Sequence, residues 1–247
     1  YVPRSRKAAT ASISFFVDCS ATLPTPSTLT LKKGPIASSE GAFGGASYIF
    51  SILEDITVPV NAGIAYFDDI LISEGTLLTS NFTYSGRNPN QKFILPNSGI
   101  DTALISVTVK GNQQSTTSTK YTTQDSLLDI KSDSKVYYLQ EIENERYELF
   151  FGDGIFGKKL EESNYITVNY ISCNGDSANG VNQFQFSGRL EYIRNSITYS
   201  VTSGISLLTT GITAQGGEVI ESVDSVKKFA PRIYASQNRA LTANDYE

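Results

Sequence analysis

The sequence predicts a mostly β protein of the α+β class, in which antiparallel β-sheet domains are followed by a C-terminal helical segment. Along most of the 247 residues, short apolar stretches alternate with polar residues, and turn signals rich in Gly, Pro and Asn separate them. A helical spacing of apolar residues occurs only near the C-terminal end. These observations favour sheets built from short strands over a helical or α/β architecture.

The expected strands share a period of two residues. Ile105, Val107 and Val109, for example, point to one face and Ser106 and Thr108 to the other, as in a half-buried antiparallel sheet. In chain order the expected strands are residues 13–17, 28–32, 48–53, 56–60, 104–109, 135–142, 146–151, 165–171, 182–186 and 196–201.

A polar tract at residues 112–126 is rich in Ser, Thr and Gln and has almost nothing to bury. It is interpreted as a linker or loop that follows an N-terminal mostly-β domain at residues 1–111. Residues 127–190 are expected to form a hairpin-rich domain, and residues 191–247 a strand plus a helical segment that packs back on the rest. The alternative for 112–126 is a loop inside a single sheet domain.

Residues 151–157 read Phe-Gly-Asp-Gly-Ile-Phe-Gly and contain the spacing of a dinucleotide-binding loop. Such a loop must open a helix, but here a polar stretch and then the strand at 165–171 follow. A single carboxylate between glycines is also too few ligands for calcium. The segment therefore predicts a β-hairpin turn and not a ligand site. The structural turn residues are Gly152, Asp153, Gly154 and Gly157.

The C-terminal region predicts two helices. Apolar residues recur at helical spacing in the first of them, at Val219, Ile220, Val223 and Val226. Pro231 is expected to end this helix. A second helix is expected to start after Thr242, which can cap the free amides, with Asp245 as the acidic half of a capping box. The chain stops within this element, as expected of a piece of a longer polypeptide.

Composition argues against catalysis and against most ligands. The chain has no His and no Trp, so the commonest general base and the usual zinc ligands are missing. Cys19 and Cys173 are far apart and are expected to be reduced and buried. The net charge is −5 with scattered basic residues, which disfavours nucleic acid, and no apolar run suggests a membrane span. We expect no catalytic residue, no cofactor and no metal.

Several short motifs occur in a fixed order along the chain. They are Leu95-Pro96-Asn97, Ile100-Asp101-Thr102, Phe151-Gly152-Asp153-Gly154, Asn174-Gly175, Asn179-Gly180, Gly216-Gly217-Glu218, Ala230-Pro231, Gln237-Asn238-Arg239-Ala240-Leu241-Thr242 and Asp245-Tyr246. Each is weak alone, but the ordered set resembles the baseplate J-like family of contractile phage tails.

The resemblance implies a structural role in a virion. Members of the family form a ring around the central hub of the baseplate, join neighbouring wedges, and relay the trigger for sheath contraction. The implied partners are a second copy of the chain, further copies that close the ring, other wedge subunits and the protein that starts the sheath. Assembly would take place in the host cytoplasm. Arg239 and Tyr246 are possible interface residues, and no nucleic-acid or membrane partner is implied.

The main alternative is a glycan-binding β-sandwich module of an adhesin or tail fibre. Such modules display exposed aromatic platforms, often of Trp. The absence of Trp and the presence of a late amphipathic helix argue against it. An enzyme is third, because the chain has neither His nor a coherent pair of carboxylates.

Overall fold

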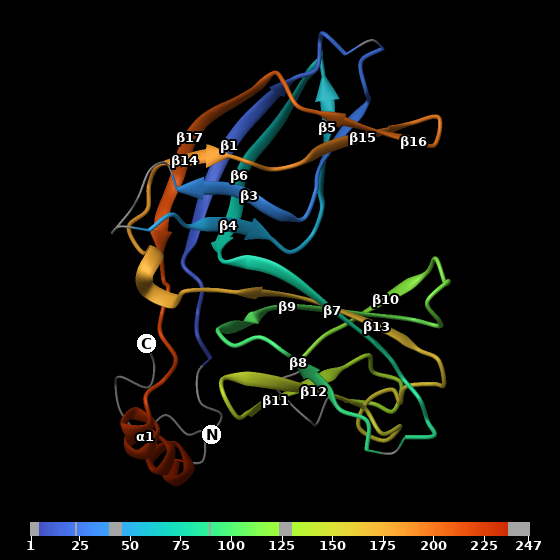
Figure 1. Cartoon of the computed structure of the whole chain (residues 1–247), viewed down its shortest axis with the longest axis vertical. Helices are drawn as coiled ribbons and strands as arrows, with labels where there is room; N and C mark the ends of the chain where they lie inside the picture. Colours follow the sequence, from blue (N-terminus) through green and yellow to red (C-terminus); the bar gives the residue numbers. More distant parts are fainter. Residues whose placement is uncertain (1–4, 23, 40–45, 89, 124–129, 237–247) are drawn as a thin grey trace.

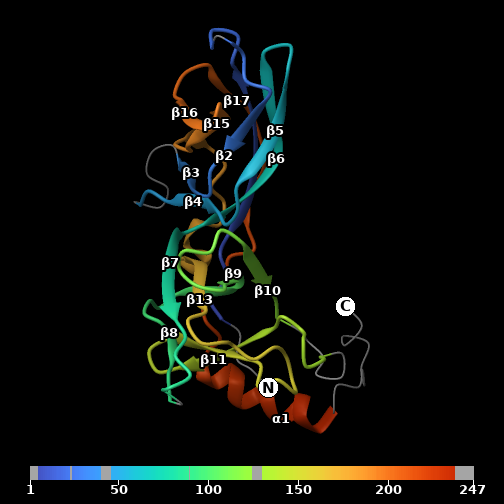
Figure 2. The ribbon, with the colours of Figure 1, turned by 90° about the vertical axis from the view of Figure 1, so that its right-hand side faces the viewer.

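The computed structural model describes residues 5–22, 24–39, 46–88, 90–123 and 130–236. The chain folds into two β bodies stacked end to end along the long axis of the molecule (Figure 1). A view turned by 90° shows the same stacking and places the C-terminal helix below the second body (Figure 2). All pairs between the named strands of the described residues are antiparallel, which confirms the mostly β part of the expected fold class.

The first unit, called the upper body, is one ten-stranded sheet system. The order of its main path is β14-β3-β4-β6-β5-β2-β15-β16, and β1 pairs with both β6 and β17. Its strands are β1 (Thr10–Asp18), β2 (Thr28–Leu31), β3 (Gly34–Ser39), β4 (Ile49–Ile52), β5 (Ile56–Asn61), β6 (Ile64–Glu74), β14 (Phe184–Phe186), β15 (Leu190–Arg194), β16 (Ile197–Val201) and β17 (Ile205–Gln215).

The second unit, called the lower body, holds two smaller sheets. Four strands pair in the order β10-β9-β13-β7 and three in the order β11-β12-β8. Its strands are β7 (Thr76–Thr83), β8 (Phe93–Leu95), β9 (Ile100–Lys110), β10 (Ser118–Tyr121), β11 (Tyr137–Ile142), β12 (Arg146–Phe151) and β13 (Tyr165–Ser172). The lower body is thus inserted in the chain between β6 and β14 of the upper body.

Each body has its own apolar core. In the upper body, Phe15 stacks on Phe67 with ring centroids 4.7 Å apart, and both rings are fully buried. In the lower body, Val107 and Val109 pack with Ile105 in one cluster, as the alternation predicts. The two cores are separate clusters, and a third, small cluster of Ala8, Ile171 and Cys173 lies near where the bodies meet.

Strand pairing crosses the expected linker at residues 112–126. Within it, β10 pairs with β9 as an antiparallel hairpin, and β9 also pairs with β13. The division of the chain into domains at this linker stays a prediction. The sheets divide the chain at other positions than the linker. They separate the chain at Gly75 and again after β13, where it enters and leaves the lower body.

The C-terminal region differs from the expected pair of helices. In the described part, helix α1 (Val223–Ser236) is the α-helix that follows the sheets, and it starts after Val219 and Ile220. Pro231 lies inside α1 instead of ending it. A proline removes only one helical hydrogen bond, so a helix can continue through it at a cost. The expected cap residues Thr242 and Asp245 lie outside the described residues.

Candidate functional site at the waist between the bodies

The two bodies meet at a narrow region, called the waist, made of residues 5–9, 74–76, 99–101, 172–175 and 216–218. Segments from distant parts of the chain are joined here by backbone hydrogen bonds. Lys7 and Glu218 exchange two of them, at 2.9 and 3.0 Å, and Cys173 N donates to Gly99 O at 2.9 Å. Glu74 N donates to Ala9 O at 2.8 Å. The waist therefore consists of several crosslinked segments and not of one linker.

Glycines allow these segments to approach one another closely. A Cβ on Gly75 would lie 2.5 Å from Ser172 O, and the residue has a φ of +125°. A Cβ on Gly217 would lie 2.3 Å from the carbonyl oxygen of Gly175. Real Cβ atoms do not approach backbone this closely, so a side chain at either position would push these neighbouring segments apart.

A buried carboxylate joins the entry and exit of the lower body. Glu74, 1% exposed, ends β6 and accepts two hydrogen bonds from Asn174, from N at 2.9 Å and from Nδ2 at 2.7 Å. Burial raises the pKa of Glu74 above its ordinary value of 4.5, while the Asn174 bonds and the charge of Arg6 act in the opposite direction. The carboxylate is thus satisfied by hydrogen bonds but pays a desolvation cost.

A second buried carboxylate holds the N-terminal segment. Asp101, 4% exposed, accepts a hydrogen bond from Ala8 N at 2.8 Å through Oδ2 and one from Ala103 N at 2.9 Å through Oδ1. Asp101 belongs to β9 of the lower body, whereas Ala8 leads directly into β1 of the upper body. The side chain therefore ties the first strand of one body to the other body.

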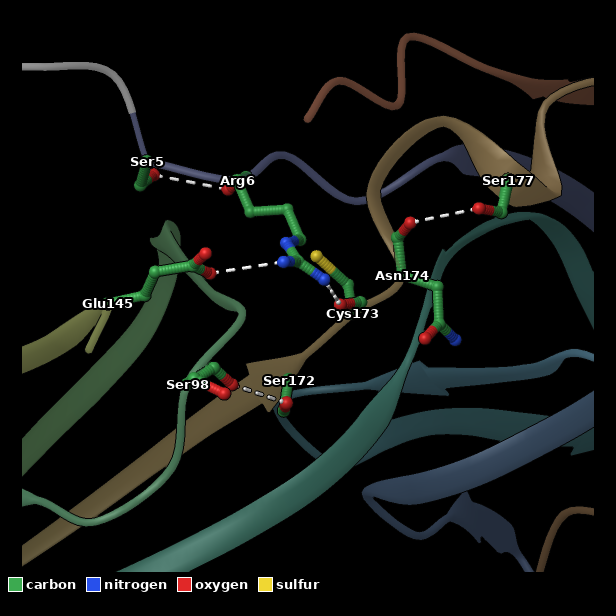
Figure 3. Close-up of polar contacts among 8 residues, drawn as sticks. All are labelled: Ser5, Arg6, Ser98, Glu145, Ser172, Cys173, Asn174 and Ser177. Carbon is green, nitrogen blue, oxygen red and sulfur yellow. Dashed lines mark hydrogen bonds and ion pairs between the residues drawn. The ribbon is translucent and has the colours of Figure 1, made fainter. Parts of the chain in front are cut away.

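Figure 3 shows the Arg6 side chain between Glu145 and Cys173. Its Nη2 forms an ion pair with Glu145 Oε2 at 3.0 Å, and its Nη1 donates to Cys173 O at 3.3 Å. Nearby, Ser172 Oγ donates to Ser98 O at 2.9 Å, and Ser177 Oγ to Asn174 O at 3.2 Å (Figure 3). Desolvation raises the pKa of the Cys173 thiol to about 11, so it stays protonated and unreactive near neutral pH.

The bodies also face each other across an open cleft of about 520 Å³ beside the waist. Residues Leu53, Glu54 and Asp55 line it from the upper body, and β9, β10 and β13 line it from the lower body. Lys120 on β10 forms an ion pair with Glu54 across this cleft. Both side chains are more than half exposed, so this contact is far weaker than the buried bonds of the waist.

The predicted turn residues form a compact structure at the end of β12. Gly154 N donates to Gly157 O at 3.0 Å, and both glycines have a φ of +94°. A Cβ on Gly152 would lie 2.1 Å from the Gly157 carbonyl carbon. Asp153 Oδ1 accepts hydrogen bonds from Ile155 N and Phe156 N, both at 2.8 Å, and these bonds lower the pKa of Asp153.

The sequence predicted a hairpin between the two strands that flank this turn. That prediction is wrong, because the flanking strands do not pair with each other. Strand β12 pairs with β11 and β8, whereas β13 pairs with β7 and β9 in the other sheet. The polar stretch after Gly157 is long enough to carry the chain from one sheet to the next. The possible interface residues Arg239 and Tyr246 lie outside the described residues.

The waist collects several of the motifs that were noted in the sequence without any link between them. Ile100-Asp101-Thr102, Asn174-Gly175 and Gly216-Gly217-Glu218 all contribute to it, and Asn179 exchanges two hydrogen bonds of 2.9 Å with Gly217. Arg6, Glu74 and Gly75 are part of the same site but stand in no recognisable motif. Their role depends on contacts between distant segments, which a single sequence does not reveal.

The described residues hold no group of three or more His, Cys, Asp or Glu side chains that could bind a metal ion. The interactions at the waist are hydrogen-bonded carboxylates, an ion pair and close backbone contacts between segments. These contacts connect the two β bodies through several segments of the chain. No helix in the described part of the chain combines the length and apolar character needed to cross a membrane.

Comparison with known proteins shows what the chain is similar to. Residues 76–181 match the family model described as the third domain of the bacteriophage baseplate wedge protein gp6. This match starts next to Gly75 and ends just beyond the waist, so it covers the lower body. The resemblance to baseplate proteins expected from the motifs is thereby confirmed.

A curated relative extends the similarity to the upper body. The baseplate wedge protein gp6 of Enterobacteria phage T4 is 23% identical over 215 residues, which cover 81% of this chain. The matched part is 31% of the relative, so the chain spans about a third of its length. Over most of its length the chain is therefore similar to a baseplate wedge protein of a phage tail.

Proposed function

We propose that this chain joins baseplate wedges into the ring around the hub of a contractile tail and relays the trigger for sheath contraction. The observation that carries the relay is the waist. Both carboxylates, Glu74 and Asp101, are buried. Glu74 accepts two hydrogen bonds from Asn174, and Asp101 accepts one from Ala8 N, which leads into β1, and one from Ala103 N. A displacement of one body is therefore transmitted to the other, because it cannot be absorbed by a loose linker.

A flexible hinge would have fewer buried contacts than the waist has. Regions that open easily have few buried contacts and solvent-exposed backbone hydrogen bonds. At the waist, a small apolar cluster of Ala8, Ile171 and Cys173 lies beneath the buried carboxylates. These features favour a rigid lever over a hinge within this part of the protein.

The proposed partners are a second copy of the chain, further copies in the ring, other wedge subunits and the protein that starts the sheath. Exposed apolar side chains on the upper body offer contact surfaces for them. Leu71 is 63% exposed, Tyr66 50% and Ile193 75%. Among these, an aromatic side chain such as Tyr66 is of a type enriched where proteins meet. We propose no reaction for this chain.

The relay is tested by weakening the waist without removing a domain. Asn174→Ala removes a side-chain hydrogen bond to Glu74 at the waist. The control, Asn164→Ala, removes side-chain bonds within the lower body, to Gly111 O and from Glu161 N. Both variants are introduced into the complete protein in assembled virions, and the fraction of contracted tails is counted by electron microscopy after host adsorption.

We expect both variants to assemble baseplates, and only Asn174→Ala to delay or reduce contraction. Thermal unfolding of both purified proteins reports their loss of stability, so that contraction can be compared at matched stability. Equal contraction of the two variants would contradict the relay. Failure of both to form rings would instead concern the proposed assembly role.

A further inference from the structure

An open pocket of about 290 Å³ lies in the lower body, at the predicted glycine turn. It is lined by Tyr138, Phe151, Asp153 and Phe156. Three of these side chains are aromatic and the fourth is a carboxylate. None of them belongs to the waist, so what the pocket binds is independent of the proposed relay.

The turn holds the pocket in a defined shape before any ligand arrives. The two bonds from Ile155 N and Phe156 N fix the Asp153 carboxylate, and Gly157 N donates to Lys131 O at 3.1 Å. Tyr138 Oη donates to Phe156 O at 3.4 Å, which connects β11 to the tip of the turn. A preorganised site loses less conformational entropy on binding than a flexible one.

On one side of the pocket Phe151 packs against the interior of the protein, whereas Phe156 is exposed to solvent. The Phe151 ring packs edge-on against Phe93 and Tyr121, at centroid distances of 5.5 and 5.8 Å. Phe156 is 52% exposed and its neighbour Ile155 69% exposed. A tight turn that presents two large apolar side chains to solvent resembles the centre of a protein–protein contact.

The charge of the pocket selects the ligand. Hydrogen bonds from backbone N–H groups favour the ionised form of Asp153, so the pocket carries a negative charge beside aromatic faces. Lys159 is close enough to favour that charge, but among the described residues it forms no ion pair with Asp153. Aromatic faces and a carboxylate together attract a cation.

We propose that this pocket binds an arginine side chain of a partner protein. A guanidinium group is planar, so it can stack on Phe156 or Tyr138 while its N–H groups reach the Asp153 carboxylate. An ammonium group is more strongly hydrated and lacks the flat face. A metal ion is disfavoured, because the pocket offers one carboxylate and no further acidic ligand.

The proposal is tested by titrating the folded chain with N-acetyl-arginine methylamide and following its amide and aromatic resonances by NMR. The matched control probe is N-acetyl-citrulline methylamide, which has nearly the same shape and no charge. We expect saturable shifts at residues 153–157 and on the Tyr138 ring. Citrulline should bind at least about threefold more weakly, the range of an exposed cation–π contact.

Variants separate the two parts of the pocket. Asp153→Asn keeps the side-chain oxygen that caps the turn and removes the charge, and Phe156→Leu removes a ring while keeping an apolar side chain. Both should weaken arginine binding by about threefold or more. Tyr199→Leu, at an exposed aromatic residue of the upper body, should leave it unchanged. Spectral dispersion confirms that each variant is folded.

Three outcomes would overturn the proposal. Arginine and citrulline could bind equally, which would make the pocket a general apolar site. N-acetyl-lysine methylamide could bind as well as the arginine probe, which would remove the role of the planar group. Finally, arginine could cause no saturable shift up to the solubility limit of the probe.

Discussion

At the waist and at the glycine turn, backbone segments approach one another so closely that only glycine fits. The Cβ of a residue replacing Gly217 would lie 2.3 Å from Gly175 O, and that of a residue replacing Gly152 would lie 2.1 Å from the Gly157 carbonyl carbon. The two regions differ in sequence separation. The turn is local, whereas the waist joins the N-terminal segment, the two ends of the lower body and the segment after β17.

This difference determines what each region can do. The turn is closed by its own hydrogen bonds and is exposed, so it can present side chains to a partner with little effect on the rest of the fold. The waist is held by groups from both bodies, so a change there alters their relation. Substitutions at matched glycines and carboxyl groups can break or sharpen this comparison.

The largest effect is expected for Gly75→Ala. The new Cβ would meet Ser172 O at 2.5 Å and Ile171 Cγ2 at 2.6 Å, at a φ of +125°. Strain and overpacking together should lower the free energy of unfolding by about 3 kcal/mol or more. The control is Gly34→Ala, with a similar φ of +119° but no atom within 4 Å of the new Cβ.

Gly34→Ala should cost only the backbone strain, about 1 kcal/mol. Urea unfolding of both variants measures the difference. Equal costs would mean that the waist can move apart to accept a methyl group, and the lever interpretation would fail.

In the turn, Gly152→Ala should cost about 2 kcal/mol, because its Cβ would overlap the Gly157 backbone. Gly154→Ala, with a φ of +94° and its nearest contact at 3.8 Å, should cost about 1 kcal/mol. Hydrogen exchange should place the loosened amides of both variants around the turn. Faster exchange at Cys173 or Lys7 would show that the turn and the waist are coupled, contrary to the comparison.

A smaller effect at the waist depends on pH. Since burial raises the folded pKa of Glu74 above 4.5, the folded state binds more protons than the unfolded state between these two values. The contribution of Glu74 to stability is therefore complete below pH 4.5 and is lost as pH rises through the folded pKa. Glu74→Gln lacks this titration and can keep both hydrogen bonds if the Asn174 amide flips.

The stability of the wild type relative to Glu74→Gln should accordingly fall as pH rises from below 4.5 toward neutrality. Urea unfolding across that range measures it. A difference that is independent of pH would mean that the hydrogen bonds from Asn174 and the charge of Arg6 balance burial, and one that rises with pH would mean that they outweigh it.

The smallest effect is expected at the exposed contact between the bodies. Lys120 and Glu54 are 57% and 60% exposed, so their ion pair is screened by water and salt. A double-mutant cycle with Lys120→Gln and Glu54→Gln should give a coupling energy of about 0.5 kcal/mol or less, decreasing with added salt. A coupling above about 1 kcal/mol would place part of the rigidity in the cleft and not in the waist.

Local patterns identified much of the sheet structure. Each expected strand overlaps an observed one, and Ile105, Val107 and Val109 share the predicted face. The expectations were less successful where local rules compete with packing. Strands β6 and β7 were not expected, although together they carry the chain from one body to the other. Asp69, with a φ of +49°, interrupts the alternation of β6 at an irregular pairing with β1.

The sequence by itself determined the period-two strands and the glycine turn at residues 152–157, because these follow from residue identity and near neighbours. Only the tertiary structure decided that β12 and β13 belong to different sheets and that α1 continues through Pro231. It alone brought Arg6, Glu74 and Asn174 together. The physical reason is that burial and close packing depend on segments far apart in the chain, whose meeting no local period encodes.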